Sequence, residues 1–129
     1  MITHLAIAPV FVSNVDESIK FFRDKLGFAV TADVPFASDF RWVTLRPPKS
    51  QTDILLYSPS GAMGNKDELE HRIGSWTGMV FYTDDIWETY KDMLNKGVIF
   101  EAEPAGQPWG GMGTWFFDPD KNRYHLAQP

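Results

Sequence analysis

The chain has 129 residues, which suits one compact domain, and its 5 Trp, 4 Tyr and 10 Phe supply enough apolar volume for a hydrophobic core. Its formal net charge of −5 argues against a nucleic-acid or anionic-membrane partner, because either requires a basic surface. The absence of Cys excludes a disulfide framework, a thiolate zinc site and a thiol nucleophile. The apolar stretch 5–12 is too short to span a membrane, and we expect no signal segment before it. We therefore expect a soluble, cytoplasmic protein.

An internal repeat organises the sequence. Residues 7–14 read as a strand that ends in a polar pair, and residues 78–85 repeat this pattern 71 positions later. Asn14 and Asp85 are each followed three positions later by a glutamate, which is the capping-box pattern of a helix start. Each half therefore passes directly from a strand into a helix.

Both predicted helices carry apolar residues at spacings of three and four, and they end at Gly27 and Gly97. Three strand-like runs follow each glycine: 28–33, 40–45 and 53–57 in the first half, and 98–103, 114–117 and 123–127 in the second. Proline-containing turns separate the last two strands of each half. Residues 58–75 read as a linker whose charged part, 66–72, could form a short surface helix. Each half is thus predicted to be a βαβββ module.

The motifs NVDESIKFFRDKLGF (14–28) and FFDPDKN (116–122), with DDI at 84–86 and KGV at 96–98, resemble the vicinal oxygen chelate family. That family includes glyoxalase I, bleomycin-resistance proteins and extradiol dioxygenases. The resemblance implies an α+β fold in which two paired βαβββ modules form a curved mixed sheet with a cupped, ligand-binding face. It implies one domain over 1–129, with module one at 1–57, the linker at 58–75 and module two at 76–129. It also implies a homodimer.

The chain departs from the family pattern in two respects. Lys121 stands where the family usually has Gly in the turn before the last strand. The resemblance also places metal ligands on the first and last strand of each module, which correspond to Ile7, Gly78, His125 and Leu55 (or Ile54, if the register is shifted by one). Only His125 offers a lone pair to a divalent ion. We therefore expect no bound metal and no cofactor, with His4 and His71 at the surface.

Strand alternation indicates which residues share a face with these positions. Tyr57 and Tyr82 lie on the predicted cup face, where apolar and aromatic groups suit a small-molecule pocket. Trp109 lies in a glycine-rich stretch, 106–113, that is predicted to be a mobile loop over the ligand; alternatively, this Trp covers a hydrophobic patch. Arg41 could bind an anionic or aromatic ligand, or pair with a carboxylate.

The sequence leaves two functions open. The first is metal-free binding of a small, flat or aromatic organic molecule by Arg41, Tyr57, Tyr82, Trp109 and His125. The second is an enzyme of lyase or dioxygenase type, either with His125 as acid or base or with a metal site that the register hides. His125 could equally be a hydrogen-bonded core group, and no catalytic residue is assigned.

Overall fold

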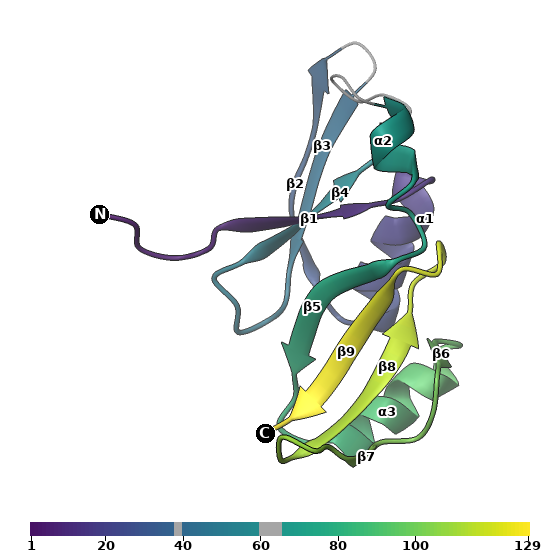
Figure 1. The fold of residues 1–129 in the computed structure, drawn as a ribbon. Helices are drawn as coiled ribbons and strands as arrows, with labels where there is room; N and C mark the ends of the chain where they lie inside the picture. Colours follow the sequence, from purple (N-terminus) through teal and green to yellow (C-terminus); the bar gives the residue numbers. More distant parts are fainter. Residues whose placement is uncertain (38–39, 60–65) are drawn as a thin grey trace. The chain divides into compact units, whose positions relative to one another are not determined.

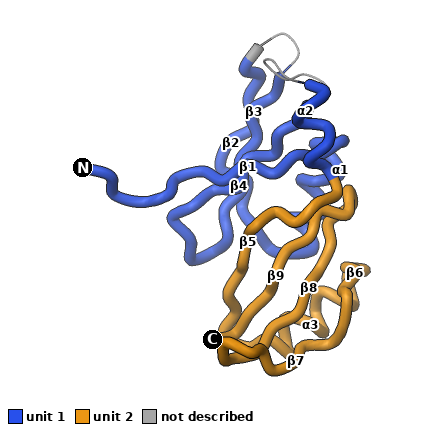
Figure 2. The backbone as a smooth tube through the Cα atoms, in the orientation of Figure 1, with its two compact units in different colours: residues 1–73 blue, residues 74–129 orange. Residues whose placement is uncertain are grey.

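The computed structural model describes residues 1–37, 40–59 and 66–129. The chain divides into two compact units, residues 1–73 and residues 74–129 (Figure 2). Each unit holds one of the two sequence repeats. The predicted α+β fold of two βαβββ modules is confirmed, and each module forms its own mixed sheet (Figure 1).

The first unit contains a four-stranded sheet in the order β1-β4-β3-β2. Its elements are β1 (Ile7–Phe11), α1 (Val15–Lys20), the π-helical turn η1 (Phe21–Lys25), β2 (Ala29–Ala37), β3 (Phe40–Arg46), β4 (Asp53–Tyr57) and α2 (Lys66–Glu70). β1 runs parallel to β4, and the other neighbours are antiparallel. The predicted surface helix is α2, which has no buried residue.

The second unit contains a five-stranded sheet in the order β5-β9-β8-β6, with β7 also paired to β8. Its elements are β5 (Trp76–Tyr82), α3 (Ile86–Asn95), β6 (Ile99–Phe100), β7 (Ala105–Gly106), β8 (Met112–Phe117) and β9 (Arg123–Gln128). β5 runs parallel to β9, as β1 runs parallel to β4 in the first unit. The two modules therefore share one topology.

Both predicted helix caps are present. The Asn14 side chain accepts a hydrogen bond from the Glu17 backbone N–H at 3.0 Å, and the Asp85 side chain accepts one from Glu88 at 3.1 Å. Each cap satisfies an amide that has no partner within the first turn of its helix. None of the helices in the described ranges is long and apolar enough to cross a membrane.

The first helix is one residue longer than the second, with twelve residues rather than eleven between its cap and its terminal glycine. The extra residue is accommodated in η1, where the Leu26 amide donates to the Phe21 carbonyl five positions earlier at 3.3 Å. A π-helical turn holds one residue more than an α-helical turn. The chain then turns at Gly27, whose φ is 77°.

Two sequence predictions in the second module need correction. The strand predicted at 98–103 is limited to β6. The Glu101 amide still donates to the Trp115 carbonyl at 2.9 Å, but residues 102–104 then leave the sheet, and Pro104 has no amide to donate. The loop predicted at 106–113 is confined to residues 107–111, which join β7 to β8 in a hairpin closed by a hydrogen bond from Gln107 N to Gly111 O at 3.0 Å. Positive φ values at Gly110 and Gly111 make this tight reversal possible.

The turn between β8 and β9 is built on Asp118. Its carboxylate accepts hydrogen bonds from two backbone amides, from the Asn122 amide and from the Tyr124 hydroxyl. Burial raises the pKa of Asp118, although these hydrogen bonds act in the opposite direction. Lys121 adopts a φ of 65°, the one positive value at a non-glycine position in the described ranges. The turn therefore forms in spite of the missing glycine.

Candidate functional site

In the second unit, α3 packs on one face of the sheet, and no helix of residues 74–129 covers the other face, which we call the open face (Figure 1). Exposure along β5 alternates strictly, with Trp76, Val80 and Tyr82 exposed. Phe81, on the α3 side, stacks against Phe116 of the core. The side chains of the open face are Trp76, Val80, Tyr82, Trp115, Phe117, Arg123, His125 and Ala127.

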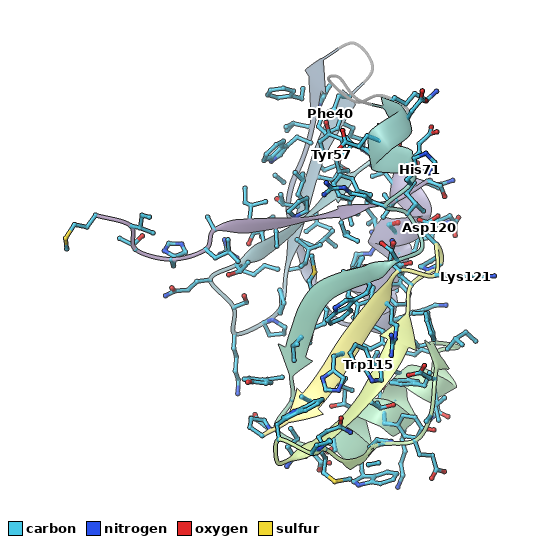
Figure 3. All side chains as sticks on the ribbon, in the orientation of Figure 1. Phe40, Tyr57, His71, Trp115, Asp120 and Lys121 are labelled. Carbon is cyan, nitrogen blue, oxygen red and sulfur yellow. The ribbon has the colours of Figure 1, made fainter. Side chains whose placement is uncertain are left out.

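A continuous row of four rings crosses the open face. Trp76 contacts Trp115 at 4.9 Å between ring centroids, Trp115 contacts His125 at 4.4 Å, and His125 contacts Trp109 at 5.9 Å. Figure 3 labels Trp115, near the middle of this row. Trp109 at one end remains 70% exposed. We call these four residues the ring row.

His125 lies within the ring row and is only 3% exposed. Its Nε2 atom is buried and has no hydrogen-bond partner in the part of the chain that the structure describes. Burial lowers the pKa of His125, and the nearby positive charge of Arg123 lowers it further. The imidazole is therefore neutral at pH 7 and has an unused nitrogen. Such a nitrogen can donate or accept a hydrogen bond, depending on its tautomer.

Arg123 lies two residues before His125 on the same face. Its guanidinium carbon is 3.9 Å from the centre of the Trp115 ring, a cation–π contact. Its Nη2 donates to Glu101 at 3.2 Å, whereas its Nε is buried and unpartnered among the described residues. The open face thus combines a flat aromatic floor with two under-used polar atoms.

Trp109, His125 and Tyr82 are the predicted site residues in the second unit. Trp109 and His125 are in ring contact, and Tyr82, 75% exposed, lies on the same open face. The predicted separation of faces therefore agrees with the structure of β5 and β9. The three side chains belong to one surface of one unit.

Tyr57 belongs to the first unit, where it contacts Phe11 at 5.5 Å and Phe40 at 4.9 Å (Figure 3). Phe36 links Phe40 to Trp42 through two further ring contacts. The first sheet therefore also presents an aromatic cluster, on the face of Tyr57.

Arg41 is not part of this cluster. Its guanidinium forms hydrogen bonds with Asp33 and with Asp16 of α1, both at 2.7 Å for the shortest contact, and these bonds raise the pKa of Arg41. Because side chains alternate along β3, its neighbour Trp42 occupies the Tyr57 face instead. The structure does not bring Arg41 together with Tyr57. Arg41 instead pairs with carboxylates, which was the alternative that the sequence left open for this residue.

Sequence reasoning missed Trp76, Trp115 and the role of Arg123. Trp76 is separated from Val80 and Tyr82 by an even number of positions, so all three share one face of the strand. A predicted strand that began at residue 76 would therefore have placed Trp76 on the face of Tyr82. Trp115 pairs with His125 across the turn at 118–122. Its position can be inferred only when the pairing of β8 with β9 across that turn is known.

The strand register tests the family's metal positions. Pro9 and Val80 occupy equivalent places in the two modules, because each lies five residues before the cap of its helix. Pro9 pairs with Leu55, and Val80 pairs with His125. Leu55 is therefore the counterpart of His125, and it carries no lone pair. In the part of the chain that the structure describes, no three His, Asp or Glu side chains lie together as a metal site would require. The residues present do not fit the family's divalent ion.

Comparison with known proteins identifies the family. The model of the Glyoxalase/Bleomycin resistance protein/Dioxygenase superfamily matches residues 1–126, and the chain belongs to this superfamily. The protein YetH of Bacillus subtilis (strain 168) is 29% identical over 128 residues, covering 99% of this chain and 100% of YetH.

Two solved structures extend this likeness. A superfamily member from Sphaerobacter thermophilus DSM 20745 has a TM-score of 0.86 and 33% identity, covering 99% of this chain and 98% of its own. TnmS3, an antibiotic binding protein from Streptomyces sp. CB03234, has a TM-score of 0.79 and 28% identity, covering 99% of this chain and 97% of its own.

Proposed function

We propose that the chain is a binding protein that holds a small, flat, aromatic organic molecule on the open face of the second unit without a metal ion. The observation that carries this proposal is the ring row, in which exposed and half-buried indoles flank a buried imidazole with an unpartnered nitrogen. Aromatic surfaces with a few polar atoms are typical of small-molecule sites.

The residues of the proposed site have different roles. Trp109 and Trp115 supply flat surface for stacking, and His125 supplies a hydrogen bond through Nε2. Tyr82 borders the same face, and Tyr57 belongs to the corresponding face of the first unit. Arg41 is left out of the site because two carboxylates already occupy its guanidinium. The description of TnmS3 as an antibiotic binding protein also supports a binding role for this chain.

The proposal is tested by mass spectrometry of small molecules that co-purify with the native protein, followed by titration of any compound found. We expect binding to quench Trp emission. Trp109→Ala should weaken binding by about 1–3 kcal/mol, the usual loss when a large aromatic contact is truncated, with little change in melting temperature. Trp87→Ala is the matched control, because Trp87 is also exposed but lies on α3.

A different result would contradict the proposal. If Trp109→Ala lowers the melting temperature by several degrees and leaves affinity unchanged, Trp109 is a structural cover over His125. The ring row would then belong to the packing of the unit and not to a ligand site.

The second candidate function is an enzyme that uses His125 as acid or base. It is favoured by the neutral imidazole with an unused Nε2, since a general base must be free to accept a proton. Turnover of a co-purified compound that is lost in His125→Gln, with binding retained, would establish this alternative over simple binding.

We also propose that the chain forms a homodimer. The N-terminal arm, residues 1–6, and the edge strand β1 expose Met1, Ile2, Leu5 and Ile7. Apolar side chains in this number on one segment favour burial against a partner chain.

A further inference from the structure

Two arginines in this chain show how a guanidinium edge is satisfied by one carboxylate. Arg41 donates to Asp33 through Nε at 2.7 Å and through Nη2 at 2.8 Å. Arg23 donates to Asp24 through the same two atoms, at 2.8 and 3.2 Å. In both pairs one carboxylate takes the whole edge, the strongest arrangement open to an arginine.

A third arginine, Arg123, has only half of this edge satisfied. Glu101 accepts from Nη2 at 3.2 Å, and Nε has no partner in the described ranges although it is buried. A buried donor without an acceptor is costly, so native structures seldom retain one without a reason. The unused atom therefore marks a position where an acceptor is missing.

The surroundings of Arg123 indicate what kind of molecule would supply that acceptor. The guanidinium lies over Trp115, and Trp115 contacts Trp76 on one side and His125 on the other. A carboxylate that pairs with the Nε and Nη2 edge lies in the plane of the guanidinium. The group attached to that carboxylate would consequently extend along the aromatic floor of the open face.

We propose that Arg123 anchors the ligand and that the ligand belongs to the class of aromatic carboxylates. Its two oxygens accept hydrogen bonds from Nε and Nη2, and Glu101 gives up its single bond to Nη2. The Glu101 carboxylate thus pairs with Arg123 in the absence of ligand, and the ligand carboxylate displaces it. This inference rests on the proposed binding function and narrows it from flat aromatic molecules to flat aromatic anions.

The experiment compares two probes of the same shape, 2-naphthoate and its neutral amide, 2-naphthamide. We expect the native protein to bind 2-naphthoate at least 10-fold more tightly. Arg123→Lys should reduce this preference at least about 3-fold, because lysine keeps the charge but cannot form the two-bond pair. Arg23→Lys is the matched control: it breaks the same kind of pair in the first unit and should leave the preference unchanged.

The variant Glu101→Gln gives a second, independent test of the proposed carboxylate anchor. Removing the competing carboxylate should tighten 2-naphthoate binding by about 3- to 10-fold and leave 2-naphthamide binding unchanged. Nitrogen NMR supplies a direct readout, since the Arg123 Nε–H signal should move and exchange more slowly with water when 2-naphthoate is added.

The outcomes separate this inference from the proposed function. Equal affinity for the two probes, with both weakened by Trp109→Ala, would overturn the carboxylate anchor and leave the aromatic binding site standing. Failure of both probes to bind, with no small molecule co-purifying, would overturn the proposed function and this inference together.

Discussion

Gly113 lies directly beneath the imidazole of His125. A Cβ atom at position 113 would stand 2.7 Å from both Cε1 and Nε2 of that ring, closer than van der Waals contact allows. The absence of a side chain at Gly113 is therefore what lets the imidazole rest on β8 with its Nε2 buried.

We predict that Gly113→Ala pushes the His125 ring outward into water and raises its pKa towards the ordinary value of about 6.5. The reason is that burial is the main cause of the lowered pKa. An NMR titration of the imidazole protons measures the effect. Gly106→Ala is the control, because a Cβ there meets no described atom within 4 Å. An unchanged titration in Gly113→Ala would show that the backbone moves instead of the ring.

The same lowered pKa predicts how stability depends on pH. Folding favours the neutral imidazole, so the stabilisation is complete above about pH 6.5, the unfolded value, and is lost as the pH falls towards the lower folded value. Urea unfolding at pH 7.5 and 5.5 should show this loss in the native protein and a smaller one in His125→Phe. An identical loss in both proteins would assign the pH dependence to other groups.

The helix caps and the face of β5 could be predicted from the sequence because they depend on local spacing. Asn14 and Asp85 need only a glutamate three positions later, and Tyr82 needs only strand alternation. The places of Arg41 and Trp115 depend on how two strands are paired. A shift of one residue moves a side chain to the opposite face, and the sequence alone does not give that register.

Lys121 gives a prediction about stability. A left-handed conformation costs a non-glycine residue about 1–2 kcal/mol, and the greater freedom of glycine in the unfolded chain offsets about 0.5–1 kcal/mol of the gain. Lys121→Gly should therefore stabilise the protein by about 0.5–1 kcal/mol, measured by urea unfolding. Lys121→Ala keeps the Cβ atom and should give no comparable gain. Equal effects of the two variants would mean that the lysine charge is the cause.

The exposed N-terminal arm gives a prediction about assembly. The native protein should sediment as a dimer at micromolar concentration, and the double variant Ile2→Asp/Leu5→Asp should associate at least about 10-fold more weakly, because each aspartate would be buried without a partner. Leu94→Asp, at a 43% exposed position on α3, is the control. A native protein that remains monomeric at high concentration would contradict the proposed dimer.

The π-helical turn η1 has a consequence for how this gene can change. A single added codon in a continuous α-helix would rotate every later residue by about 100° and turn its apolar stripe away from the core. In η1 the wide turn absorbs the extra residue, so that Phe22 and Phe28, on either side of Gly27, both remain buried. A module of this repeat can therefore hold one residue more or fewer at the position of residues 21–25 and still place the following strand in the sheet.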